Sequence, residues 1–159
     1  MITKEVYKEF SKNGFNVIPL VKNLKTKVSS PVELYSNIKN KKNTFLLESI
    51  EGGERWAQYS IIGLNCSDSI KISGSKIEIK KGTETELLNS DNPLDELDKI
   101  IGEYKSPEIK NLPRFYGGFV GFFAYESAQY AEKKIQSLIK KESKFNEHMP
   151  DIYLSLIHI

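Results

Sequence analysis

The stretch SIKISGSKIEIK constrains the fold of this chain more than any other segment. Four isoleucines alternate with polar residues on either side of a glycine: Ile70, Ile72, Ile77 and Ile79 around Gly74. Successive side chains of a strand point to opposite faces, so this alternation predicts an antiparallel hairpin with one buried face. Other elements of the chain have to cover that face.

Helices are predicted on both sides of this hairpin. One begins after Thr3, a second at Ser30-Pro31, and a third at Asn92-Pro93, and a fourth runs from about Ser127 to Lys141. Short strands are predicted at Asn16–Val21 and along the aromatic, glycine-rich segment Leu112–Glu126, and the polar residues before Asn92 are expected to form a loop. Helices mixed with antiparallel hairpins, in place of alternating βαβ units, predict an α+β domain with antiparallel sheet layers.

Composition and charge exclude several classes of protein. The 159 residues, with 39% apolar and 28% charged side chains, suit one globular domain. A net charge of +2 is too small for a dedicated nucleic-acid-binding protein. No apolar run approaches the roughly 18 residues of a membrane-spanning helix, and the N-terminus lacks a signal segment, so we expect a cytoplasmic protein.

Metal and disulfide sites are not expected from these residues. Cys66 is the only cysteine, which excludes an internal disulfide and a cysteine metal cage. His148 and His158 stand ten positions apart, without the spacing of a zinc site. No nucleophile, base and oxyanion donor come together in the sequence, so no catalytic residue is assigned.

The segment FLLESIEGGERWAQYSIIG predicts a second hairpin, and Glu48-Ser49 interrupts its first apolar run. One interpretation is that the strand ends there and the two side chains face water. The other is that the strand end faces a small polar ligand beside an apolar slot. A free amino acid has this chemistry, because its carboxylate takes hydroxyl and N–H donors while its side chain fills the slot.

Four motifs occur together in one order: SPVELY, FLLESIEGGERWAQYSIIG, YGGFVGFFAYE and MPDIYL. In this order and spacing they resemble the N-terminal region of anthranilate synthase component I, over about Phe10 to Tyr153. The resemblance implies the N-terminal part of that α+β fold, truncated before a larger catalytic portion.

The resemblance also implies a function in tryptophan biosynthesis. The family converts chorismate and glutamine-derived ammonia to anthranilate and pyruvate with Mg²⁺. The catalytic residues and Mg²⁺ ligands belong to the missing portion, so the 159-residue piece alone is expected to be inactive. A glutamine amidotransferase, component II, is the implied partner, since this chain carries no Cys-His glutaminase pair.

The feedback site is the part of the family's function that the resemblance places in these residues. Ser49 of the LLES motif is implied to bind L-tryptophan, the allosteric inhibitor, and Leu47 and Glu48 to line the same pocket. Arg55 is included less securely, because Gln58 stands where the family frequently has Arg.

The boundaries and the alternatives complete these expectations. We expect residues 1–153 to form the tryptophan-binding region. Residues 154–159 are expected to be a non-native or truncated tail, because their sequence resembles translated sequencing-adaptor read-through. Three other functions stay open: component I of aminodeoxychorismate synthase, a stand-alone amino-acid-binding module, and an α+β interaction domain without a ligand.

Overall fold

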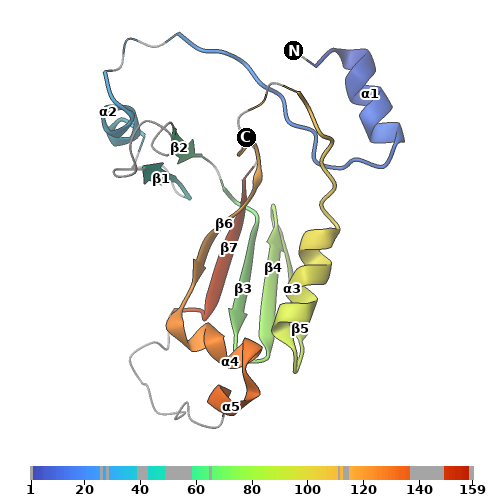
Figure 1. Ribbon diagram of the computed structural model, residues 1–159, viewed down its shortest axis with the longest axis vertical. Helices are drawn as coiled ribbons and strands as arrows, with labels where there is room; N and C mark the ends of the chain where they lie inside the picture. The colour runs from blue at the N-terminus through green and yellow to red at the C-terminus, as the bar shows by residue number, and fades with distance from the viewer. Residues whose placement is uncertain are drawn as a thin grey trace.

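A five-stranded antiparallel sheet forms the centre of the computed structural model, which describes residues 2–25, 27, 29–38, 43–48, 59–64, 66–110, 112, 115–136 and 149–157. Its strands are β3 (Ser69–Ser73), β4 (Lys76–Lys81), β5 (Glu84–Asn89), β6 (Gly118–Phe123) and β7 (Ile152–Ile157). They lie in the order β5-β4-β3-β7-β6, and all neighbouring pairs are antiparallel (Figure 1). The predicted α+β class with antiparallel sheets is confirmed.

The hairpin predicted from its alternating isoleucines is β3–β4. Ile70 pairs with Ile79 and Ile72 with Ile77, and all four are buried. Gly74 turns the chain with φ +60°, a conformation that glycine adopts without strain. The buried face also includes Ile152 and Leu154 of β7 and two residues of helix α3, so it is the core of the domain.

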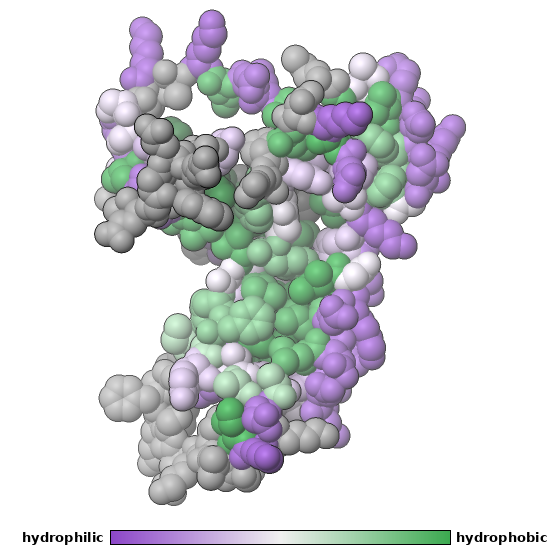
Figure 2. All heavy atoms as spheres, viewed as in Figure 1, coloured by the Kyte–Doolittle hydropathy of each residue, from purple (hydrophilic) through white to green (hydrophobic). Residues whose placement is uncertain are grey.

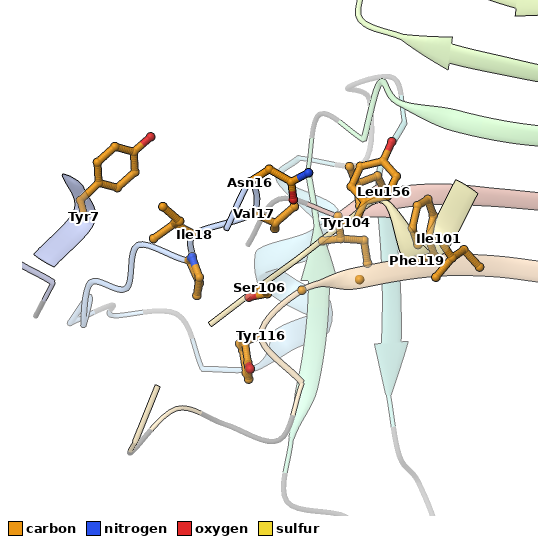
Figure 3. Close-up of a pocket in the computed structure, with 14 residues that line it drawn as sticks. Tyr7, Asn16, Val17, Ile18, Ile101, Tyr104, Ser106, Tyr116, Phe119 and Leu156 are labelled. Atoms are coloured by element: carbon orange, nitrogen blue, oxygen red, sulfur yellow. The ribbon is translucent and has the colours of Figure 1, made fainter. Parts of the chain in front are cut away.

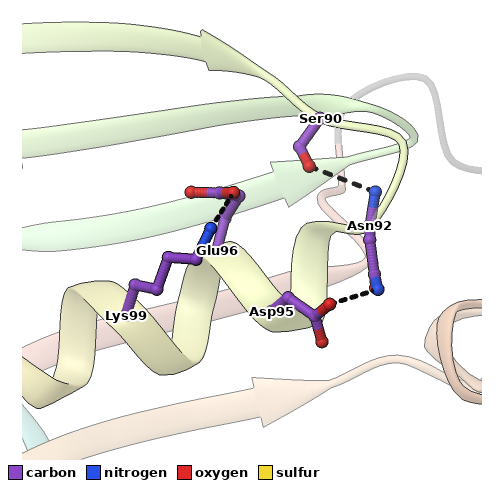
Figure 4. A network of polar contacts seen from close by, with 5 residues as sticks. All are labelled: Ser90, Asn92, Asp95, Glu96 and Lys99. Atoms are coloured by element: carbon purple, nitrogen blue, oxygen red, sulfur yellow. Dashed lines mark hydrogen bonds and ion pairs between the residues drawn. The ribbon is translucent and has the colours of Figure 1, made fainter.

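Helix α3 (Pro93–Gly102) covers this face with Leu97 and Ile100, as its apolar side predicts. Its predicted start at Asn92-Pro93 is confirmed, although the Asn92 side chain does not cap the backbone. The Asn92 amide instead donates to Asp95 Oδ2 at 2.5 Å, and Lys99 pairs with Glu96 at 2.8 Å one turn later (Figure 4).

Strand β5 corrects the prediction of a loop before Asn92. It pairs with β4 along its whole length, from Lys76 opposite Asn89 to Lys81 opposite Glu84. Most of its side chains are exposed because it is an edge strand, so its sequence is polar and gives little β signal.

The segment after β6 corrects another prediction. The helix expected from about Ser127 to Lys141 is a 3₁₀ turn, η1 (Tyr125–Ser127), followed by the short helices α4 (Ala128–Ala131) and α5 (Lys133–Gln136). Glu132 adopts an extended conformation between them and interrupts the helix. Residues 137–148 lie outside the described part.

Asp151 ties this segment to the sheet. Its Oδ2 accepts hydrogen bonds from the Tyr130 hydroxyl and from the Gly74 N–H, the latter at 2.9 Å. Its backbone N–H donates to the Ile72 carbonyl at 2.8 Å, and its carbonyl accepts from the Ala124 N–H at 2.7 Å. One residue thus connects α4, the β3–β4 turn and the end of β6.

The N-terminal residues form α1 (Lys4–Lys12), which Thr3 caps by accepting from the Val6 N–H at 3.4 Å. The strand predicted at Asn16–Val21 is wrong, because this segment pairs with none of the strands that the structure describes. The Asn16 side chain donates to the Glu103 carbonyl and accepts from the Lys105 N–H, both at 2.7 Å, so the segment is held by the chain that leaves α3.

A second, two-stranded sheet contains β1 (Phe45–Glu48) and β2 (Ser60–Gly63), and α2 (Pro31–Ser36) precedes it. In Figure 1 these elements lie with α1 toward one end of the five-stranded sheet, and α4 and α5 lie at the other. Hydrophobic side chains gather over the middle of the molecule in Figure 2, and hydrophilic ones line the right-hand side of that view.

Candidate functional site

The candidate ligand site is the end of strand β1 in the second sheet. Leu47 and Glu48 are the last two residues of β1, and both are exposed, Leu47 by 44%. Ser49 and Arg55 lie outside the described residues, as do Gly52 and Gly53, where the turn of the predicted hairpin is expected. The structure therefore describes two of the four predicted site residues, which are consecutive in β1.

The predicted hairpin itself is confirmed, with β1 and β2 paired from Phe45 opposite Gly63 to Glu48 opposite Ser60. The Ser60 hydroxyl donates to Glu48 Oε1 at 3.5 Å. Ser60 is a neighbour that the sequence did not single out, since the hairpin register depends on the length and shape of the connection.

Contacts at the opposite end of β1 hold the strand in place. The Tyr35 hydroxyl of α2 lies 3.4 Å from the Thr44 carbonyl oxygen, to which it donates, and 3.3 Å from Thr44 Oγ1. The Cys66 N–H donates to the Asn43 carbonyl at 3.1 Å. These bonds fix the start of β1 and leave its last residues, Leu47 and Glu48, accessible.

The Cys66 thiol does not contribute a reactive group to this region. It is buried, and burial raises its pKa. A thiol with a raised pKa is less often ionised and therefore a poor nucleophile or metal ligand.

Strand geometry limits what Leu47 and Glu48 can contact together. Adjacent side chains of a strand point to opposite faces, so a ligand lying on one face of β1 reaches only one of the two. A ligand placed beyond the last residue of the strand can approach both. The exposed apolar side chain and the carboxylate at this position suit the side chain and the ammonium group of an amino acid.

A separate cavity of about 510 Å³ lies between the N-terminal segment, the end of α3 and the start of β6 (Figure 3). Aromatic rings and small polar groups form its wall, among them Tyr7, Asn16, Tyr104, Ser106, Tyr116 and Phe119. None of the described residues that line it is charged. The described wall thus supplies no ionic partner for the carboxylate or ammonium of a free amino acid, whereas the end of β1 carries the Glu48 carboxylate.

Metal and membrane features were searched in the described residues as well. No three His, Cys, Asp or Glu side chains among them come together in a way that could hold a metal ion. In that same part of the chain, no helix has the length and the apolar character needed to cross a membrane.

Comparison with known proteins gives consistent relatives. Anthranilate synthase component 1 of Neisseria meningitidis serogroup B is 39% identical over 157 residues, covering 98% of this chain and 32% of that protein. The protein of the same name from Pseudomonas aeruginosa is 33% identical over 154 residues, covering 96% and 31%. The chain is homologous to the N-terminal third of anthranilate synthase component 1.

A more distant relative agrees with this identification. Anthranilate synthase component 1 of Acinetobacter calcoaceticus is 30% identical over 155 residues, covering 94% of the chain and 30% of that protein. No family model matches the chain. The chain thus spans about a third of the length of the curated relatives that it matches, and the expected family is confirmed.

Proposed function

We propose that this chain is the regulatory region of an anthranilate synthase component I, and that it binds L-tryptophan at the end of β1. The homology extends over nearly the whole chain, which is the single observation that carries this proposal. The accessible Leu47 and Glu48, with Ser49 next in sequence, support the position of the site.

The complete subunit would convert chorismate and ammonia to anthranilate and pyruvate. Mg²⁺ and the catalytic side chains would belong to the remaining two thirds of the subunit. Within this chain, residues 1–153 would form the regulatory region and residues 154–159 a non-native tail, although residues 154–157 of that tail make up the last four of the six residues of β7.

Inhibition occurs in this scheme because tryptophan prefers one arrangement of the regulatory and catalytic portions. Binding at the end of β1 shifts the population toward that arrangement. The free energy of this shift is limited by the difference in tryptophan binding free energy between the two arrangements. Weaker binding at this site therefore weakens the inhibition.

The test is Ser49→Ala in the complete subunit. A hydrogen bond to a charged group contributes roughly 1.5–3 kcal/mol, so the tryptophan concentration for half-inhibition should rise about 10- to 150-fold. Ser11→Ala, at an exposed position of α1, is the matched control and should leave inhibition unchanged. An unchanged tryptophan response in a folded, active Ser49→Ala subunit would remove Ser49 from the site.

The partner and the product are tested in the same preparation. Without a partner, the subunit should accept ammonia as its nitrogen source. It should accept glutamine only when an amidotransferase component II is added. Turnover with glutamine in the absence of a second subunit would contradict the proposed partnership. Accumulation of aminodeoxychorismate instead of anthranilate would assign the chain to the related synthase.

A further inference from the structure

Gly63 and Phe45 face each other at the open end of the β1–β2 hairpin, opposite to the end where residues 49–59 connect the two strands. Gly63 is the last residue of β2, is buried, and pairs with Phe45, the first residue of β1. A β-carbon at Gly63 would lie 1.9 Å from Phe45 Cε1, 2.4 Å from Cζ and 2.6 Å from Cδ1. The aromatic ring therefore occupies the space that the side chain of any other residue would need.

The requirement for glycine here comes from the ring and not from the backbone. Gly63 is not among the described glycines with a positive φ, such as Gly74 and Gly82, so its conformation is open to other residues. An aromatic ring over a glycine of the neighbouring strand is a cross-strand contact that stabilises one particular pairing.

The same ring also borders the five-stranded sheet. Phe45 lines a small cavity of about 150 Å³ together with Val120 and Gly121 of β6 and Tyr153 of β7. Gly121 is itself a close contact, since a β-carbon there would lie 1.8 Å from the Tyr153 carbonyl oxygen. Phe45 thus lies where the two sheets meet.

We propose that Phe45 and Gly63 lock the register of the β1–β2 hairpin and so position the ligand-binding end of β1. A slip by one residue would set Phe45 against Ile62 or Leu64, and a β-carbon would then stand opposite the ring where Gly63 has none. It would also turn every side chain of β1 to the opposite face, including Leu47 and Glu48. The regulatory consequence rests on the proposed function, whereas the lock itself does not.

The test is Gly63→Ala in the complete subunit, with two readouts. A methyl group forced into this contact destabilises the observed register of the hairpin. If the register positions the end of β1, the tryptophan concentration for half-inhibition should rise about fivefold or more. Hydrogen exchange at the amides of β1 and β2 should accelerate by a similar factor, while turnover with ammonia is unchanged. Gly102→Ala is the control, because a β-carbon at Gly102 meets nothing within 4 Å.

A second variant separates the ring from the glycine. In a Phe45→Leu background, Gly63→Ala should have almost no further effect on either readout, because the ring that it strikes is gone. If Gly63→Ala prevents folding, the double variant should restore it. An effect of Gly63→Ala that persists without the ring, or a failure of the double variant to fold, would overturn the proposal.

The outcomes also distinguish this proposal from the function on which it rests. Unchanged exchange and unchanged inhibition in Gly63→Ala would refute the lock even if Ser49→Ala abolishes inhibition. Faster exchange in the hairpin, with inhibition insensitive to Ser49→Ala, would keep the lock and refute the tryptophan site.

Discussion

The hydrogen bond between Tyr130 and Asp151 makes a specific prediction for the replacement Tyr130→Phe. The Tyr130 hydroxyl donates to the same Asp151 oxygen that accepts the Gly74 N–H. Phenylalanine keeps the ring and removes only this donor. We therefore expect α4 to lose its polar connection to the sheet, while β3 and β7 keep their ladder.

The size of the effect follows from the type of bond. A hydrogen bond to a charged group contributes roughly 1.5–3 kcal/mol, and we take the lower value because Tyr130 is only partly buried. About 1.5 kcal/mol corresponds to about tenfold in the opening equilibrium of the segment. Hydrogen exchange in the complete subunit should thus be about tenfold faster at the amides of Ser127 and Glu132, which are bonded within this segment.

Tyr125→Phe provides the control, since Tyr125 undergoes the same chemical change and is 91% exposed. It should leave the exchange of this segment unchanged. The reasoning would be refuted if Tyr130→Phe had no effect on Ser127 and Glu132, or if it accelerated β3 and β4 to the same extent.

Three further predictions concern pH, packing and the isolated chain. Burial, together with the hydrogen bond to Asp151, raises the pKa of Tyr130 above its usual value of 10.0; the folded state then holds a proton that the unfolded state releases. The stabilisation is complete below about pH 10 and is lost as pH rises toward the raised pKa, so denaturant titrations from about pH 9 to 11 should show a smaller fall in Tyr130→Phe than in the wild type. Gly121→Ala should lower the free energy of unfolding by about 3 kcal/mol or more, because the new β-carbon would meet the Tyr153 backbone. It should therefore reduce the soluble yield far more than Gly102→Ala does. The 159-residue chain alone should bind an apolar dye and unfold without cooperativity, since Phe123 is 56% and Tyr125 91% exposed; a cooperative transition without dye binding would contradict this.

The sequence predicted correctly those helices and strands whose signal lies within a few neighbouring residues. The β3–β4 hairpin follows from four alternating isoleucines, and α3 follows from its apolar side and the Asn92-Pro93 start. Strand β5 was missed because Glu84 and Glu86 face solvent on an edge strand. The strand predicted at Asn16–Val21 failed although the segment contacts residues distant in the sequence. The backbone N–H groups of Asn16 and Val17 both donate to the Lys105 carbonyl, and the Asn16 side chain bonds Glu103 and Lys105, so the bonds converge on one point and form no strand ladder.

The candidate site likewise contains features that the sequence predicted and features that it could not predict. The second hairpin agrees with the prediction from its sequence, whereas the exposure of Leu47 and Glu48 fits both interpretations of the strand end, one facing water and one facing a ligand. The register that sets Glu48 opposite Ser60 and Phe45 opposite Gly63 could not be predicted, because it depends on the connection between the strands. The roles of Ser49 and Arg55 stay predictions, since both residues lie outside the described part.

The place of β7 in the sheet has a consequence for synthesis on the ribosome. β7 lies between β3 and β6, and its residue Ile152 pairs with Ile72, about 80 residues earlier. A nascent chain can form β3, β4, β5 and α3 from neighbouring residues, but β6 has no described partner strand other than β7. Closing the long loop between β3 and β7 is slow, and β6 stays unpaired until β7, of which Ile152 and Tyr153 precede the proposed tail, leaves the exit tunnel. During that interval its uncharged edge is open to other chains, and holdase chaperones would be expected to bind there first.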